Sequence, residues 1–589
     1  MGKDRYQKIK FYIIVLTFLY CVPFHIMSMI YSIDLKENNT LSQETLVIYN
    51  KIISQPNVIW GGISIVDKEI LLQSDTIQIE LDDTIIVVYA IYKNSEINYR
   101  YIHYSSFDKN ANIYLSVYDN SIVAEINTKS GAYKMFSISE NELSIVKLEL
   151  KYIEEEPVYI DNQSEVDEQL AENSELSSVM PTSLPVIRVL FLYTDSAMNL
   201  IKKESLYTWM SDKDKVRLLA FNYINKGNES FSNSKVNAHL EIAYIGHTTF
   251  NESSHTWSNV LKYFYKNGDG YMDEVHTLRN KYKADVCVLL VNKTDYCGEA
   301  KEIKADASTA FCLIWPSDDF CNWRFSAIHE IGHLIGCRHN RSADNSNSPY
   351  KYGHGYMYCN ETTSSASWCT IMSYESTCSA NSKRILYWSN PDTTYNGIAT
   401  GTTTYENNAR VWNERAGTVS AFRTKDNSIA LTANDNNSSA LFESYEASTS
   451  ITTSSGYQVQ AEQTVDMAAG NIIRLTSGTL IKIGSKFRAS IRNNADNSPY
   501  PQFVIRKDTN DNRLQRQTNF SIIPNPVNDI LTIVTEEEIN NAVIYNLTGI
   551  QLLLSNSKYI NVSSLPQGVY VISVVTKGNG TYQSKFVKQ

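Results

Sequence analysis

Cysteine is missing from most of this 589-residue chain. One stands at Cys21, and the other eight fall between Cys287 and Cys378, both included. An even number of cysteines crowded into one region of an exported chain indicates disulfide bonds, here up to four, in a pairing that the sequence leaves open. No two of them form a Cys-x-x-Cys pair, which disfavours a cysteine-bound metal as the alternative. We therefore expect local disulfides, with Cys337 among the bridged residues.

Basic residues are outnumbered: 53 lysines and arginines stand against 63 acidic residues, for a net charge of −10. No basic stripe is present to neutralise phosphates, which excludes nucleic acid as the main partner. From Tyr152 to Ile187 there is no lysine or arginine, and nine acidic residues lie between Glu154 and Glu175. Such a segment cannot bury enough apolar surface to fold alone. We expect residues 151–185 to form an acidic linker that is cut on activation, with an uncut linker as the alternative.

Long apolar runs are scarce, and the clearest one lies at the N-terminus. Four basic residues among the first ten precede an apolar run from Phe11 to about Ile30, which Pro23 and His25 interrupt. This order is typical of a signal peptide, which we place at residues 1–32. A retained membrane anchor is the alternative, because the run approaches the length that spans a bilayer.

Only ten histidines occur in the chain, yet three of them stand at the spacing of metal ligands. The segment from His329 to His339 reads H-E-x-x-H-x-x-G-x-x-H. On a helix, His329 and His333 project from one face toward one ion. Gly336 lets the chain leave the helix through a left-handed residue, and the turn returns His339 as a third ligand. Three protein nitrogens and an open fourth position are typical of catalytic rather than structural zinc.

Glu330 follows the first ligand and is expected to face the water on the metal. Zinc would lower the pKa of that water toward about 7, and Glu330 would accept its proton as general base and deliver it to the leaving amine. The sequence thus predicts a secreted zinc endopeptidase that acts on extracellular proteins or peptides. A catalytically weak, zinc-containing surface adhesin and a processing enzyme with one target remain the alternatives. Calcium is possible, but no residue pattern supports it.

Downstream, Thr370–Tyr374 resembles the Met-turn of the metzincins, the zinc peptidases with this long histidine motif. The resemblance implies that Met372 is an apolar floor beneath the ligands. It also implies that Tyr374 approaches the metal or the reacting oxyanion, ordinary packing being the alternative. Tyr352–Tyr356 and Arg384–Pro391 are similar to bacterial reprolysin-like members of that class.

The resemblance covers residues 186–424 and implies an α/β domain with a mixed, twisted sheet and packed helices. His354, a fourth nearby histidine, is interpreted as structural. Thr309–Trp315 is expected to be the edge strand that borders the cleft, with an interior strand as the alternative. The other elements expected in order are strand Val186–Tyr193, helix Asp212–Phe231, strand Val236–Ile245, helix Tyr271–Lys283 and strand Ala284–Val291.

Residues 33–150 alternate apolar and polar side chains in short runs, such as Thr76–Leu81 and Ile113–Tyr118. This pattern predicts a β-rich domain, which resembles the propeptide that precedes reprolysin-like domains. A separate binding domain is the alternative. No cysteine lies between Cys21 and Cys287, so latency through a propeptide thiolate on zinc is excluded, whereas a propeptide carboxylate could serve.

The C-terminal third of the chain predicts all-β modules. Residues 425–518 are expected to form a β spacer without a catalytic constellation. Residues 519–589, which include Phe520–Asp529 and Leu565–Ile572, are similar to the C-terminal sorting domain of the bacterial type IX secretion system. The resemblance implies a small β-sandwich, the type IX machinery as partner, and a secreted or surface-attached protein of a Gram-negative bacterium. Association with the outer-membrane surface is possible.

Overall fold

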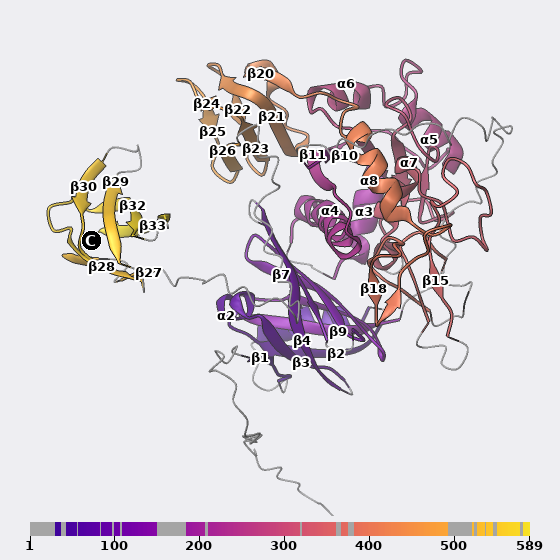
Figure 1. Ribbon diagram of the computed structural model, residues 1–589, viewed down its shortest axis with the longest axis horizontal. Helices are drawn as coiled ribbons and strands as arrows, with labels where there is room; N and C mark the ends of the chain where they lie inside the picture. The colour runs from indigo at the N-terminus through magenta and orange to yellow at the C-terminus, as the bar shows by residue number, and fades with distance from the viewer. Residues whose placement is uncertain are drawn as a thin grey trace, which may run out of the picture. The chain divides into compact units, whose positions relative to one another are not determined.

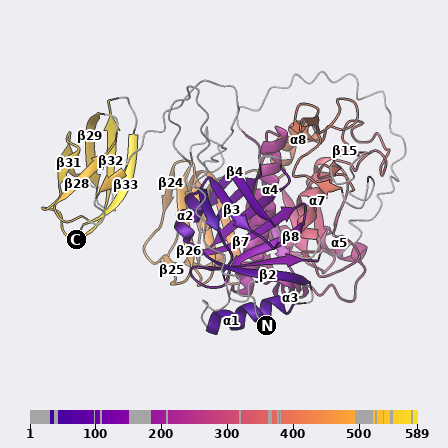
Figure 2. The ribbon, with the colours of Figure 1, turned by 90° about the horizontal axis from the view of Figure 1, so that it is seen from below.

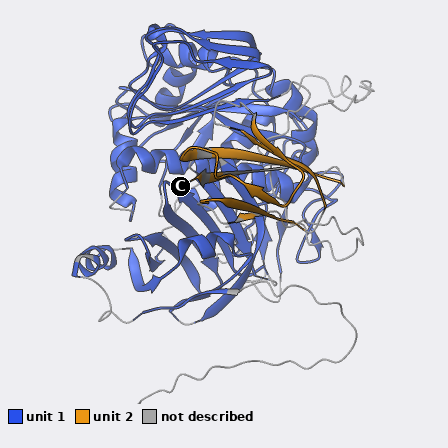
Figure 3. Cartoon of the chain, turned by 90° about the vertical axis from the view of Figure 1, so that its left-hand side faces the viewer, with its two compact units in different colours: residues 1–506 blue, residues 507–589 orange. Residues whose placement is uncertain are grey.

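The structure is a computed structural model that describes residues 30–36, 43–149, 184–492 and 521–588, apart from short gaps within these ranges. It divides into two units, residues 1–506 and 507–589 (Figure 3). The predicted acidic linker, residues 151–185, lies outside the described residues except for residues 184 and 185. Most of the predicted signal segment lies outside them as well. Among the residues described, no helix is both long and apolar enough to cross a membrane.

The first part of unit 1 is a nine-stranded sheet (indigo in Figures 1 and 2) with the order β1-β3-β4-β5-β6-β7-β8-β9-β2. Two helices, α1 (Gln43–Ile53) and α2 (Lys68–Gln73), accompany it. Consecutive strands from β3 to β9 pair antiparallel, as expected for strands joined by short turns. The strands are β1 (Ile30–Ile33), β2 (Val58–Ile65), β3 (Thr76–Glu80), β4 (Ile85–Glu96), β5 (Tyr99–Ser105), β6 (Asn112–Tyr118), β7 (Ser121–Thr128), β8 (Gly131–Ser137) and β9 (Glu142–Leu148).

The N-terminal sheet agrees with the predicted β-rich domain in character and differs from it at its first strand. The β-rich character is confirmed, although the two helices were not expected. Strand β1 pairs in parallel with β3, so the sheet begins at Ile30, inside the predicted signal segment 1–32. A hydrophobic run cannot by itself separate the end of a signal from the start of a buried strand, because both are apolar.

The second part of unit 1 is built on a central mixed sheet. Strand β10 (Val186–Tyr193) lies between β11 (His239–His247) and β12 (Val286–Leu290), and β14 (Phe311–Ile314) follows β12, all in parallel. These strands are apolar almost throughout because helices and loops cover both faces. The helices of this region are α3 (Asp195–Glu204), α4 (Asp212–Ser234), α5 (Trp257–Tyr265), α6 (Glu274–Lys281), α7 (Ser326–Ile335) and α8 (Asn408–Val419).

The expected edge strand is interior. Strand β14 pairs with β12 on one side and with the short antiparallel β13 (Gly298–Ala300) on the other, which makes β13 the end of the described sheet. The prediction that Thr309–Trp315 borders the cleft as an edge was therefore wrong. A three-residue strand is too short to show a period in the sequence, so its covering role could not be recognised.

Beyond residue 425 the chain forms a parallel coil of strands that continues the central sheet. Strand β21 (Ala440–Thr453) pairs antiparallel with β11, and β23 (Thr464–Ala469) and β26 (Lys486–Ile491) follow in parallel. Glu443 pairs with Val465, and Val465 pairs with Phe487, so each coil is about 22 residues long. Strands of the predicted β spacer, residues 425–518, thus share one sheet with the preceding domain. The remaining strands are β20 (Asp426–Leu431), β22 (Gln458–Val459), β24 (Ile472–Arg474) and β25 (Leu480–Ile481).

Unit 2 consists of two small sheets around a core of its own, which agrees with the predicted β-sandwich. Buried residues from both sheets, such as Leu531 and Ile572, belong to this core. One sheet contains β27 (Ser521–Ile523), β28 (Ile530–Val534) and β31 (Tyr559–Asn561), and the other contains β29 (Ile539–Tyr545), β30 (Gln551–Ser555), β32 (Gly568–Thr576) and β33 (Thr581–Lys588).

Two disulfides, Cys297–Cys321 and Cys359–Cys378, are present. The other four cysteines of the region are buried thiols outside these two disulfides, and Cys337 is one of them, which contradicts the expectation that it is bridged. A free Cys337 need not compete for a metal. Burial holds the pKa of its thiol well above the usual value, so it stays protonated.

The four buried thiols are expected to resist alkylation in the folded protein. Burial raises the pKa of Cys287 to about 11 and that of Cys312 and Cys337 well above 9, so at pH 8 the reactive thiolate is scarce as well as shielded. Iodoacetamide at pH 8, followed by peptide mapping, should label these positions only after denaturation. Labelling of Cys337 in the native protein, or its recovery in a disulfide, would contradict the assignment.

Candidate metal centre

Helix α7 carries two of the predicted ligands and is bounded by two residues of positive φ. It starts after Phe325 (φ 61°) and ends at Gly336 (φ 127°). A Cβ at Gly336 would be strained by this φ and would also lie 2.9 Å from Cε2 of Tyr350. The glycine thus ends the helix and turns the chain toward the third histidine, as the motif predicted.

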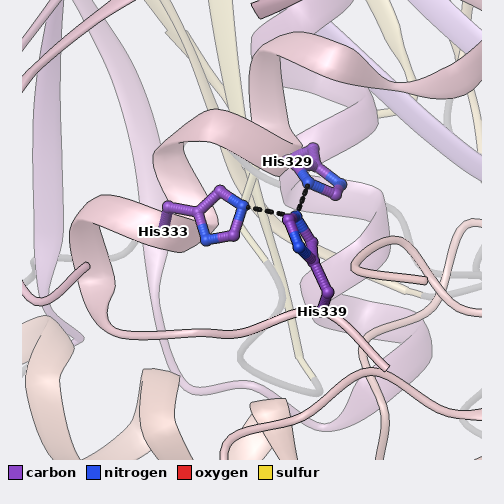
Figure 4. A group of neighbouring side chains, drawn as sticks. All are labelled: His329, His333 and His339. Carbon is purple, nitrogen blue, oxygen red and sulfur yellow. Dashed lines mark hydrogen bonds between the residues drawn. The ribbon is translucent and has the colours of Figure 1, made fainter. Parts of the chain in front are cut away.

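The three histidines of the motif converge on one point (Figure 4). His329 and His333 project from α7, and His339 comes from the segment after it. The Nε2 atom of His339 lies 3.3 Å from Nε2 of His329 and 3.0 Å from Nε2 of His333. All three side chains are buried, with at most 3% of their surface exposed. Among the described residues, this is the group of histidine, cysteine and acidic side chains that could hold an ion.

Backbone carbonyls fix the tautomers of the two helical ligands. His329 Nδ1 lies 2.8 Å from the carbonyl oxygen of Ile371, and His333 Nδ1 lies 2.8 Å from that of Cys337. Since a carbonyl only accepts, both Nδ1 atoms carry the proton, and both Nε2 atoms present lone pairs to the centre.

The spacing of these nitrogens suits zinc. Zinc binds imidazole nitrogens at about 2.0–2.1 Å with tetrahedral angles, which separates two such nitrogens by about 3.4 Å. The observed separations of 3.0 and 3.3 Å are close to this value. Carbonyl contacts to the outer nitrogens of His329 and His333 are also the usual way to orient histidine ligands. The residues present therefore fit the expected ion.

Glu330 lies beside the histidines and against strand β13. Its side chain is 1% exposed. A Cβ added to Gly298 would lie 2.6 Å from Cγ of Glu330, so the glycine leaves the room that this carboxylate occupies. Gly298 is a residue that the sequence did not mark as functional. It follows Cys297, whose disulfide to Cys321 ties β13 to the segment before α7.

Met372 and Trp388 lie under α7 at the level of Gly332. A Cβ on Gly332 would approach the Met372 sulfur to 2.9 Å and the Trp388 ring to 2.8 Å, and both side chains are fully buried. Trp388 is held in turn by α4, since its Nε1 donates to Oγ of Ser230 at 2.8 Å. Met372 was predicted as a floor residue. Trp388 lies in the segment that resembles the reprolysin-like peptidases, but no sequence pattern predicts its place beneath the helix.

Tyr374 reaches the centre from the turn that follows Met372. Its hydroxyl lies 3.3 Å from Nε2 of His339, and its backbone N–H donates to Oδ1 of Asn340 at 3.1 Å. Asn340 thereby joins the segment of the third ligand to the Met372 turn. It was missed in the sequence, where its only signal is its position after His339.

His354 contacts the backbone of the third ligand rather than the centre itself. Its Nδ1 donates to the carbonyl oxygen of His339 at 2.7 Å, and the side chain is fully buried. Burial lowers the pKa of His354, which favours the neutral ring. The structural interpretation of this residue agrees with these contacts.

Comparison with known proteins places this domain in a family. Residues 185–389 match the metallo-peptidase family M12, and residues 521–589 match the secretion system C-terminal sorting domain. Peptidyl-Asp metalloendopeptidases of Stenotrophomonas maltophilia and Xanthomonas campestris are 42% and 39% identical over 200 residues, which is 34% of this chain and 46% and 45% of those proteins. The match thus spans about half the length of these relatives.

A shorter relative is covered completely. The peptidyl-Asp metalloendopeptidase of Pseudomonas fragi is 30% identical over 198 residues, which are 34% of this chain and 100% of that sequence. The sorting domain indicates a secreted or cell-surface location. With the three-histidine centre on a mixed sheet, these matches show that the chain belongs to the metallo-peptidase family M12.

Proposed function

We propose that the protein is a secreted zinc endopeptidase. The observation that carries the proposal is the convergence of three buried imidazoles beside a buried glutamate, in the order H-E-x-x-H-x-x-G-x-x-H. Membership of family M12 supports it, and the sorting domain supports export through the type IX machinery to the cell exterior or outer-membrane surface. Extracellular proteins and peptides are then the substrates.

The role proposed for each residue follows from its position at the centre. His329, His333 and His339 hold zinc, which when bound supplies a Lewis acid for the attacking water and the scissile carbonyl. Glu330 accepts a proton from the water and delivers it to the leaving amine. The phenol of Tyr374 donates a hydrogen bond to the developing oxyanion.

We further propose a preference for peptide bonds beside aspartate. Three relatives at 30–42% identity are named peptidyl-Asp metalloendopeptidases.

Digestion of casein by the secreted protein tests both proposals. Fragments should appear without a chelator, disappear with 1,10-phenanthroline at about millimolar level and return with added zinc, as expected for a metal held by only three side chains. Mass spectrometry of the fragments should show cleavage concentrated beside aspartate and not beside asparagine. Absence of fragments from casein and gelatin under all conditions would instead favour the catalytically weak adhesin, and cleavage without regard to aspartate would refute the preference alone.

The segments that precede the metallopeptidase domain have roles in export and activation under this proposal. We propose that residues 1–32 contain the export signal, that residues 33–150 form a prodomain, and that activation cuts the chain within 151–185. Latency would not involve a cysteine, since the N-terminal sheet contains none.

A further inference from the structure

Helix α4 is buried on almost all sides, including charged positions. Glu229 and Asn225 are fully buried, and Lys226 is 4% exposed. Lysine and glutamate are rarely buried to this degree unless they are paired. One face of α4 packs on the central sheet, where Asn228 bonds both backbone groups of Leu240. The opposite polar face therefore requires partners from elsewhere.

Those partners come from one face of the N-terminal sheet. Tyr99, Tyr101 and His103 alternate along β5, so their side chains share a face. Tyr99 donates to Oδ1 of Asn222 at 2.6 Å, and Tyr101 donates to Oε2 of Glu229 at 2.9 Å. His103 Nδ1 contacts the other oxygen of Glu229.

A charged pair and a further amide contact lie on the same face. Lys226 Nζ lies 2.6 Å from Oε2 of Glu125 on β7, and Asn94 on β4 donates to Oδ1 of Asn225 at 2.6 Å. Burial and the charge of Glu229 hold the pKa of Tyr101 well above its usual value, so its phenol remains a donor to that carboxylate. Asn222, Asn225, Lys226 and Glu229 of α4 thus each have a hydrogen-bond or ion-pair partner on the sheet.

Aromatic contacts extend the surface toward the metal helix. Tyr99 stacks on Phe221 of α4 with ring centroids 5.0 Å apart. Tyr114 of β6 packs edge-on against Phe325, the residue before α7, at 6.3 Å. The N-terminal sheet therefore contacts the metallopeptidase domain through α4 and the start of α7. In the described residues it supplies no side chain to the three-histidine group.

Apolar as well as polar side chains make up this surface. The N-terminal sheet has an apolar core of its own, which includes Ile102, Ile113 and Leu115, and these residues alternate with the side chains that face α4. Around the polar stripe of α4, Tyr99, Tyr101 and Tyr114 of the sheet belong to the same buried apolar cluster as Phe221 and Ile224 of α4. The surface therefore combines apolar burial, which favours association, with polar pairs that make it specific.

We propose that the N-terminal sheet is a non-covalent partner of the metallopeptidase domain that stays bound to α4 after the connecting segment is cut. The polar stripe Asn222, Asn225, Lys226 and Glu229 is its docking surface. The proposal concerns binding and is independent of catalysis.

The test begins with the full chain. A recognition sequence for a site-specific protease is placed between Glu154 and Glu175, the chain is cut, and the two pieces are followed by size-exclusion chromatography and by their dissociation rate. The variants are Lys226→Met, Glu125→Gln, their combination, and Glu229→Gln. The matched control is Glu414→Gln, which removes a carboxylate with 42% of its side chain exposed on α8. Circular dichroism of each uncut variant establishes that it is folded.

The cut wild-type pieces should migrate together at micromolar concentration. Each single interface variant should weaken their association by about tenfold or more, because it leaves a buried charge or acceptor without its counterpart. The effects of Lys226→Met and Glu125→Gln should be non-additive, because both remove one contact, and Glu414→Gln should have no effect. Immediate separation of the wild-type pieces, or effects of the two changes that simply multiply, would overturn the proposal. Since no step requires metal or substrate, its failure is distinguishable from failure of the proposed function.

Discussion

Replacing Glu330 by alanine is expected to lower kcat/KM for peptide hydrolysis by about 10²–10⁴-fold, the usual contribution of a positioned general base. The three histidines do not depend on the carboxylate, so one zinc ion per chain should remain bound. Hydrolysis of a quenched fluorescent peptide gives the rate, and metal analysis of the dialysed protein gives the stoichiometry.

The control for this change is Glu414→Ala, which removes an exposed carboxylate on α8 that pairs with Arg410. It should leave the rate within about twofold of wild type, since exposed ion pairs of this kind contribute little. If Glu330→Ala hydrolyses the peptide at the rate of this control, Glu330 is not the general base. If it loses zinc as well as activity, the residue has a structural role at the centre that its position beside Gly298 does not indicate.

Replacing His339 by alanine is expected to abolish both tight zinc binding and activity. The ligand group would lose the nitrogen that lies 3.0 and 3.3 Å from the other two, and two histidines one helical turn apart form an incomplete site. Zinc that exceeds its Kd about 1,000-fold stabilises a folded protein by about 4 kcal/mol. The wild-type protein should therefore unfold at a higher temperature with zinc than with a chelator, and His339→Ala should lose this difference.

His276→Ala serves as the matched histidine control, because His276 lies on α6 and bonds the carbonyl oxygen of Lys266. It should keep both the zinc content and the zinc-dependent rise in unfolding temperature. Retention of one tightly bound zinc by His339→Ala would show that the three-imidazole group is not the metal site.

The parts of the site that the sequence predicted are those set by local geometry. A four-residue spacing on a helix fixes where His329 and His333 point, and a glycine that must adopt positive φ fixes where the helix ends. The strand Val186–Tyr193 was predicted with the observed bounds, because a buried parallel strand reads as a continuous apolar run.

The parts that escaped prediction depend on contacts between distant segments. The carbonyl of Ile371 orients a histidine 42 positions earlier, and Gly298 makes room for a glutamate on another element. Neither role is marked by a pattern of neighbouring residues in the sequence. The 22-residue repeat of the strands after residue 440 was not predicted, because its coils share few identical side chains. Cys337 was wrongly expected to form a disulfide, because a count of cysteines does not reveal which of them are buried as thiols.

The pairing of β11 with β21 has a consequence for how the metallopeptidase domain can be produced as a shorter fragment. Tyr244, Ile245 and Gly246 of β11 have partners in β21, which lies beyond the end of the sequence matched by the peptidase family. A fragment that stopped at residue 424 would leave these backbone groups on an open strand edge, and open edges recruit other chains. A fragment that extends through the parallel coils to about Ile491 keeps β11 paired with β21, so the coils cover this edge of the peptidase sheet.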